Sequence, residues 1–342
     1  MIDFRYHLVS IIAVFLALAI GLVVGAAALQ PTETKALLAL SSHERKTNQT
    51  LEQDNNALSK QNAADQSFAQ AASGRLLADL LAGQRVVLVT APGADNTTIS
   101  GVTAAVQQAG AKLTGQVSLE PQFFDTGGGT ESNLEAQARQ AAPPGVAAAG
   151  DAANPEYGQQ SAANVIAAAL VTKDGPGASA AAIQSSAILS GFAQQGYLHV
   201  SGNDGTLGAQ RATLAVVIIP AAPPGSETGP LNQGLVVVAQ ALQGASNGTL
   251  LAGSLAGSGP GSVIDAIASG NISASLTTVD SADLQTGQIM VAQALAGLLA
   301  GHKPAQYGVA SNVVPSPAPT PSATATAQPT PTAPGRKTAA QR

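Results

Sequence analysis

The chain has 342 residues, of which 45% are hydrophobic, 10% charged and 3% aromatic, and it contains no cysteine. This composition excludes a disulfide-stapled scaffold and a chain that is disordered overall, and the length allows one large domain with accessory segments. The formal net charge is −5, and residues 76–310 carry 14 acidic side chains against six basic ones. Because phosphate recognition needs clustered Lys and Arg, we exclude nucleic acid as a partner.

The first element is an apolar segment over residues 8–29, with 22 consecutive positions that carry no charged side chain. A helix of this length, at about 1.5 Å per residue, reaches the roughly 30 Å of a bilayer's hydrocarbon core. A cleaved secretory signal is the alternative, because residues 26–28 are three alanines that offer a small-residue cleavage site. The apolar run exceeds the about 7–15 residues of a signal core, so we expect residues 1–29 to remain as an anchor in a membrane lipid bilayer.

The charges that flank this segment predict its orientation. Arg5 and the N-terminal amine outweigh Asp3 on the short side, whereas Glu33 and Lys35 cancel on the other side. Positive charge favours the cytoplasm, so we expect a single-pass protein of the cell membrane with a cytoplasmic N-terminus and the bulk of the chain extracytoplasmic. The absence of cysteine is compatible with that location and does not decide it.

Two glycines inside the anchor, Gly21 and Gly25, form a G-x-x-x-G spacing, which lets two membrane helices approach closely. The same spacing is frequent by chance in a helix rich in Ala and Gly. Association of the anchor into a homo-oligomer therefore stays open at this point.

Residues 30–75 are polar, and Pro31 at their start predicts a new helix there. Leu37, Leu51 and Leu58 share one heptad position of this helix, but acidic residues interrupt the series. Fewer than half of the seam positions are apolar, so a coiled coil and a solvated helical stalk both remain open.

From residue 76 the pattern alternates between strands and helices. A continuous β-branched run predicts a buried strand at 85–91, and a second apolar run predicts one at 212–219. Further strands are expected at 112–119, 249–252 and 276–279. Apolar residues at helical spacing predict helices at 97–109, 231–243, 262–268 and 283–300, and the segment 134–195 has a mainly helical pattern.

Strands that alternate with helices predict a doubly wound, mostly parallel α/β domain over residues 76–310, with right-handed crossovers. The remaining residues, 311–342, are rich in Pro, Thr, Ala and Ser. Such a composition cannot form a core, so we expect a disordered tail.

Two Gly-rich turns of the domain resemble phosphate-binding loops only in part. Residues 257–261 lack the dinucleotide spacing and contain a proline, so we expect a structural turn between a strand and a helix. Asp95 follows the first strand and is expected to cap the next helix. We expect neither a cofactor nor catalytic residues, and hence no enzyme.

Metal ligands are sparse in the sequence. His7, His43, His199 and His302 lie in four different segments without ligand spacing, and the methionines are Met1 and Met290. Because Cu(I) and other soft metals need clustered Cys, Met or His, we expect each histidine to be an ordinary residue. The residues of any metal site stay unknown.

Three polar residues follow the last predicted strand directly: Asp280, Asp283 and Gln288. Doubly wound folds place ligands at the carboxyl ends of their strands, so these residues are candidates for a pocket. The alternative is structural, with helix capping by Asp283 and turn formation by Asp280.

Two stretches carry a family resemblance. The N-terminal segment Phe4–Gly21 (FRYHLVSIIAVFLALAIG) is similar to the opening of the actinobacterial copper transporter family, and the segments Thr278–Asp283, Gly287–Gln288 and Tyr307–Gly308 resemble its closing pattern. The similarity covers roughly residues 1–310 in the same order, and the anchor is its most specific part.

The resemblance implies a role in copper efflux or copper homeostasis across the cell envelope, with copper handled directly or indirectly. It also implies an outer-membrane location as an alternative to the cell membrane, since mycobacterial members are described as channel-forming proteins there. A non-catalytic envelope scaffold and a ligand-binding protein with an anchored α/β domain remain the alternative functions.

Overall fold

The computed structural model describes residues 4–127, 129–147, 157–173, 179–201, 210–221, 229–269 and 275–309. The chain divides into two compact units between Ser67 and Phe68. The expected tail at 311–342 lies outside the described residues, as does Asp3 of the N-terminal flank.

The first unit is a single helix. Helix α1 spans Phe4–Leu77, so its last ten residues belong to the second unit. It includes both the expected anchor and the expected stalk, and it runs through Pro31 rather than starting there. Proline in a helix interior removes one hydrogen bond, but the Ala and Leu residues that precede it favour the helix strongly enough to continue.

Within α1, Tyr6–Ala26 is a run of 21 residues with a mean hydropathy of 2.9, none of it buried inside protein. By length and composition, it is the one helix of the described residues that could cross a membrane. Further along α1, Leu51 and Leu58 are 54% and 63% exposed. The coiled coil therefore stays a prediction.

The second unit is built on a seven-stranded sheet with the order β3-β2-β1-β4-β5-β6-β7. All neighbouring strands are parallel except β2 and β3. The strands are β1 (Arg85–Thr90), β2 (Lys112–Leu119), β3 (Leu198–Ser201), β4 (Leu214–Ile218), β5 (Gly248–Ala252), β6 (Thr277–Val279) and β7 (Gln306–Tyr307). This order reverses between β1 and β4, as in a doubly wound fold, so the predicted fold class is confirmed.

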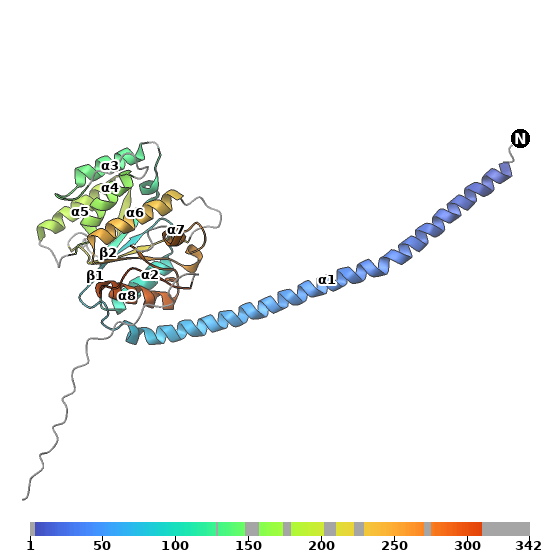
Figure 1. The fold of residues 1–342 in the computed structure, drawn as a ribbon, viewed down its shortest axis with the longest axis horizontal. Helices are drawn as coiled ribbons and strands as arrows, with labels where there is room; N and C mark the ends of the chain where they lie inside the picture. The colour runs from blue at the N-terminus through green and yellow to red at the C-terminus, as the bar shows by residue number, and fades with distance from the viewer. Residues whose placement is uncertain are drawn as a thin grey trace, which may run out of the picture. The chain divides into compact units, whose positions relative to one another are not determined.

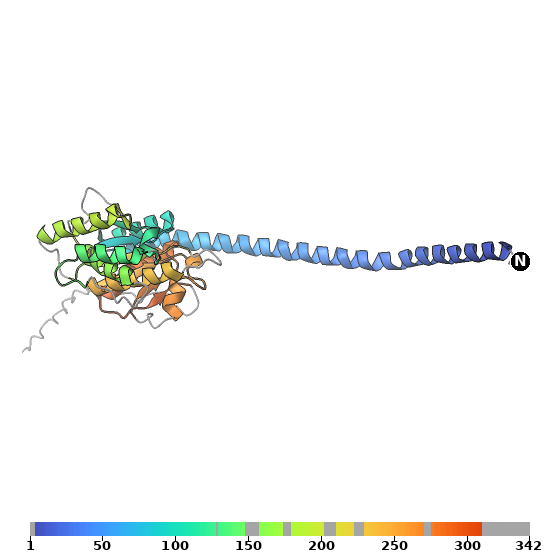
Figure 2. The ribbon, with the colours of Figure 1, turned by 90° about the horizontal axis from the view of Figure 1, so that it is seen from above.

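Helices cover both faces of the sheet (Figure 1 and Figure 2). One layer holds α3 (Thr130–Ala141), α4 (Tyr157–Leu170), α5 (Ser179–Gln194), α6 (Gly229–Ala245) and α7 (Val263–Ser269). The other layer holds α2 (Asn96–Gln108), α8 (Gln285–Leu299) and the last turns of α1. Two short 3₁₀ helices, η1 (Pro121–Phe124) and η3 (Leu255–Gly257), follow β2 and β5.

The strands supply both cores by alternation. Val87 and Val89 of β1 face the layer of α3 to α7, whereas Val86 and Leu88 face α2 and α8. Side chains alternate along a strand, so a strand that is apolar at every position is stable only between two helix layers. Packing between two helix layers therefore explains the continuous apolar run at 85–91.

Two strands lie outside the predicted strand ranges. β3 has four residues at the antiparallel edge of the sheet, and β7 has two residues at the other edge. Such short segments carry too few positions for a periodic pattern, and their pairing depends on neighbours that are distant in the sequence. The other strands and helices lie within a few residues of the predicted ranges.

Helix α8 begins in close contact with the turn that precedes it. A Cβ added at Gly287 would overlap the carbonyl oxygen of Ser281, whereas a Cβ at the exposed Gly244 of α6 would meet nothing within 4 Å. We predict that Gly287→Ala lowers the free energy of unfolding by about 1–3 kcal/mol, because the backbone must move apart. Gly244→Ala should raise it by up to about 1 kcal/mol, because alanine favours the helix.

Urea unfolding of the full chain in detergent micelles, followed by circular dichroism, checks this pair. Equal effects of the two substitutions would contradict the close contact at the start of α8.

Candidate functional site

The Gly-rich turns at the carboxyl edge of the sheet are closed by the protein's own side chains. Asp95 caps α2, since its Oδ2 accepts a hydrogen bond from the Thr98 amide at 2.9 Å, as the sequence predicted. This backbone hydrogen bond is the main cause that lowers the pKa of Asp95 below its ordinary value.

The second Gly-rich turn precedes α7. The Asp265 amide donates to Ser262 Oγ at 3.1 Å, and the Gly261 amide donates to Asp265 Oδ2 at 3.0 Å. The two side chains therefore satisfy the backbone donors that a phosphate would need. The predicted structural role of residues 257–261 is consistent with these contacts.

A buried polar cluster, which the sequence did not predict, lies at the start of α4. Glu131 is 6% exposed, and its Oε2 accepts hydrogen bonds from the amides of Gly158 at 2.6 Å and Gln159 at 3.3 Å. Its carboxylate thus occupies the helix N-terminus, where many α/β proteins bind an anion. Glu131 and Gly158 are 27 residues apart and lie at the starts of two different helices, α3 and α4, so no spacing rule could pair them.

Gln159 belongs to the same cluster and is fully buried. Neither its Nε2 nor its Oε1 has a hydrogen-bond partner, and a Cβ at Gly234 of α6 would lie 3.0 Å from that Oε1. Gly234 therefore makes room for the amide and for the Phe124 ring. A glycine inside a predicted helix was the one sequence signal of this close packing.

The three residues predicted to form a pocket have different surroundings. Asp280 is fully buried and accepts a hydrogen bond from the Val309 amide at 3.0 Å, whereas Asp283 is exposed. Gln288 is 8% exposed and lies against Gly101 of α2. The two main cavities of the described residues have other linings, so the pocket stays a prediction.

The structural alternative for these residues is partly wrong. The N-cap of α8 is Leu284, which makes no side-chain capping bond, so Asp283 does not cap the helix. Asp283 lies one residue before the capping position, where its carboxylate is turned out to solvent. Asp280 ties the chain after β7 to the end of β6 through the Val309 amide.

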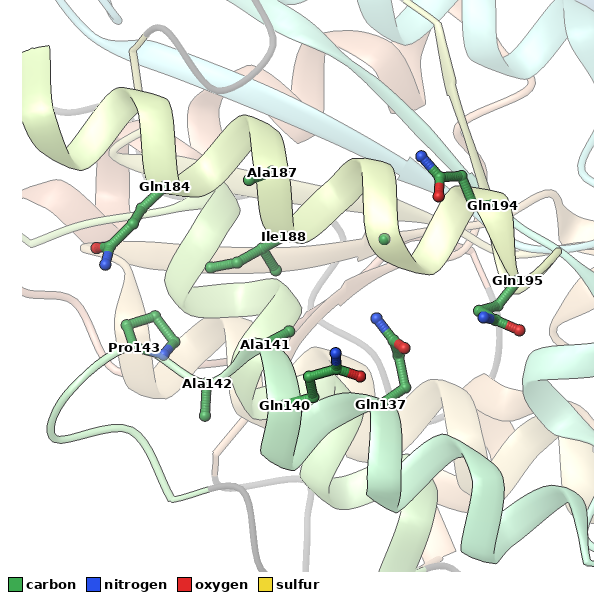
Figure 3. Close-up of a pocket in the computed structure, with 11 residues that line it drawn as sticks. Gln137, Gln140, Ala141, Ala142, Pro143, Gln184, Ala187, Ile188, Gln194 and Gln195 are labelled. Atoms are coloured by element: carbon green, nitrogen blue, oxygen red, sulfur yellow. The ribbon is translucent and has the colours of Figure 1, made fainter.

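One cavity is a cleft between α3 and α5 with a volume of about 530 Å³ (Figure 3). Its polar lining consists of five glutamine side chains, and no charged residue lines it: Gln137, Gln140, Gln184, Gln194 and Gln195. A Cβ at Gly191 would approach Gln137 Nε2 to 2.8 Å, so this glycine leaves space for the amide. Each amide offers both donors and an acceptor, which suits a neutral, hydrogen-bonding ligand.

A G-x-S-x-G pattern occurs at Gly244–Gly248, with Ser246 at its centre. In hydrolases this pattern links a strand to a helix and exposes the serine. Here it links α6 to β5, and Ser246 is 2% exposed with its Oγ 3.1 Å from Thr249 Oγ1. The pattern is therefore a structural turn.

The four histidines are exposed and are spread over three parts of the structure. His7 and His43 lie on α1, His199 on the edge strand β3, and His302 after α8. Among the described ranges, no group of three or more His, Asp or Glu side chains is placed to hold a metal ion. Gly21 and Gly25 have no atoms within 4 Å of an added Cβ, and their role in association stays a prediction.

These features define a class of protein: a doubly wound α/β domain that follows a helix long and apolar enough to cross a bilayer. The chain belongs to the family described as copper transport outer membrane protein MctB, which it matches over residues 1–317. The family named from the N-terminal and closing motifs is thereby confirmed.

Individual relatives match over nearly the full length. The copper transporter MctB of Mycobacterium tuberculosis and that of Mycobacterium bovis are each 29% identical to the chain over 314 residues. The copper transporter MctB of Mycobacterium leprae is 29% identical over 323 residues. Each alignment covers 90% of this chain and 96% of the relative.

The burial of Asp280 generates a prediction about stability. Asp280→Ala should lower the free energy of unfolding by about 1–3 kcal/mol, because the Val309 amide loses a charged acceptor. The matched control is Asp283→Ala, which should change it by less than about 0.5 kcal/mol, since that side chain is exposed. Urea unfolding measures both, and a larger loss for Asp283→Ala would contradict the structural role of Asp280.

Proposed function

We propose that the chain is a single-pass membrane protein of the cell envelope that serves copper efflux or copper homeostasis. The observation that carries the proposal is the family match over residues 1–317, which includes the apolar helix as well as the α/β domain. The curated relatives are named copper transporters and are covered over 96% of their length. We therefore propose a role in copper transport for this chain as well.

The anchor in this proposal is Tyr6–Ala26 of α1. Large apolar side chains are exposed all around this segment, for example Phe15 at 68%, Leu22 at 73% and Val23 at 66%. Contact with water at these positions is costly, and lipid removes that cost. The N-terminus is cytoplasmic and the α/β domain extracytoplasmic, with residues 30–75 as the stalk between them.

Copper is handled indirectly in this proposal. Cu(I) prefers thiolate and thioether ligands, whereas the chain has no cysteine and its Met290 is packed between α8 and the sheet. Of the four histidines, two lie far apart on α1, one lies on β3 and one follows α8. In this proposal the chain acts without catalysis. It works either as a homo-oligomer formed through Gly21 and Gly25 or together with partner proteins.

A ligand-binding module is the second candidate function, and the cleft between α3 and α5 favours it. The cleft has the volume of a small-molecule site, and its uncharged amide lining suits a neutral ligand rather than a copper ion. An envelope scaffold without a ligand is the third candidate function. It predicts that substitutions in the cleft leave copper tolerance unchanged.

The test of the copper role is the growth of a gene-deletion strain at rising copper concentrations. We predict that the deletion raises copper sensitivity at least several-fold and that the full chain restores tolerance. A chain that lacks residues 1–29 should not restore it, because the domain would lose its membrane location. A variant with Gln137→Ala and Gln194→Ala separates the readings, since loss of tolerance with normal protein levels would favour the ligand-binding module.

Zinc and cadmium serve as control metals in the same growth assay. Unchanged copper tolerance of the deletion strain would overturn the copper role and favour the scaffold.

The indirect role predicts weak copper binding by the chain itself. In a copper titration of the full chain in detergent, we expect no stoichiometric submicromolar binding of Cu(I). A variant in which His7, His43, His199 and His302 are replaced by alanine should behave like the wild type. Tight binding that disappears in this variant would contradict the indirect role and favour direct transport.

A further inference from the structure

Basic side chains gather at the amino-terminal edge of the sheet, opposite the edge where doubly wound folds bind ligands. Residues 76–310 contain six basic residues, and five of them lie at or beside the starts of strands: Arg85 (β1), Lys112 (β2), Arg211 (before β4), Lys173 (beside β5) and Lys303 (before β7). Lys112, Lys173 and Lys303 are exposed. The nearby carboxylate along the chain is the exposed Asp79, in the connection from α1 to β1.

Arg85 is the unusual member of this group because it is only 8% exposed. Its Nε donates a hydrogen bond to the backbone oxygen of Arg211 at 2.8 Å, while its Nη2 is buried and has no hydrogen-bond partner. The guanidinium is charged at every physiological pH. A buried charge without a counter-ion lowers stability, so its retention calls for a partner.

The neighbours of Arg85 add positive charge. Lys112 is its register partner on β2, and Arg211 contributes the carbonyl group that holds Nε. Adjacent strands are about 4.8 Å apart, so the backbone positions of the three basic residues are neighbours. The ion pair found among the described residues, Arg139 with Glu135, lies on α3 and does not involve this group. Arg211 directs one guanidinium nitrogen, Nη1, to the backbone oxygen of Ala168 at 3.4 Å, so a bound anion shares this side chain with the end of α4. Basic residues that start from neighbouring strand positions favour a bound anion.

We propose that this edge of the sheet binds a phosphate-type oxyanion at Arg85, Lys112 and Arg211. The planar guanidinium group presents parallel donors that match the oxygens of a phosphate, and the lysine adds a mobile charge. The anion is either free phosphate or the headgroup of an acidic phospholipid, which share this chemistry. The site is independent of copper and of the cleft between α3 and α5.

The experiment measures thermal unfolding of the full chain in maltoside micelles, a medium without phosphate groups. One arm adds inorganic phosphate at constant ionic strength, and the other adds phosphatidylglycerol to the micelles in phosphate-free buffer. A ligand that binds the folded state raises the midpoint. We expect a rise of about 5–10 °C at a hundred times the dissociation constant, which continues with the logarithm of the ligand concentration.

Three variants test which residues cause the rise in the unfolding midpoint. Arg85→Met should abolish the rise while the protein still folds, since it replaces an unpaired buried charge by an apolar chain of similar length. Lys112→Gln changes an exposed side chain, which keeps the fold intact, and should weaken the rise. Arg139→Met, a change at the exposed ion pair on α3, should leave the rise unchanged.

The outcomes are distinct. A rise with phosphate that Arg85→Met abolishes supports a site for the free anion, and a rise with phosphatidylglycerol alone supports a headgroup site. No rise in either arm, or a rise that both Arg85→Met and Lys112→Gln retain, overturns the proposal.

Discussion

The parallel sheet needs an apolar cover on both faces, and most other features of the domain follow from this constraint. Strands such as β1 and β4 are buried at every position, with alternate residues in two separate cores. Helices fill both faces, so polar groups that serve binding can gather only at the two edges of the sheet or on the outside of the helices. The carboxyl edge, the amino-terminal edge and the cleft between α3 and α5 are such places.

The direction of the helices then separates the charges. After a parallel strand the next helix begins at the carboxyl edge, where its N-terminus favours negative charge. Asp95, Glu131 and Asp265 bind backbone amides at the starts of α2, α4 and α7. The protein's own carboxylates thus fill positions that nucleotide-binding relatives of this fold leave to phosphate. The basic residues are left for the opposite edge.

The sequence predicted what depends on local pattern. The buried run at 85–91, the strand at 112–119, the Asp95 cap and the apolar segment of α1 each consist of neighbouring residues, so they can be predicted from periodicity and composition. Contacts across the fold were not accessible in this way. Glu131 with Gly158, and Arg85 with Arg211, join segments 27 and 126 residues apart. The placement of Asp280, Asp283 and Gln288 after one strand was correct, but their partners depend on α2 and on the chain after β7.

The anchor and the domain contribute different physical properties to the proposed role. Beyond Tyr6, His7 and Ser10 at its start, the segment Tyr6–Ala26 is apolar, so most of its length in one copy offers a permeating ion no groups that replace its water shell. The domain carries its polar groups at sheet edges and in an uncharged cleft. The proposed contribution to copper efflux therefore rests on assembly. Either several copies combine their anchors and histidines, or the domain recruits and positions another component.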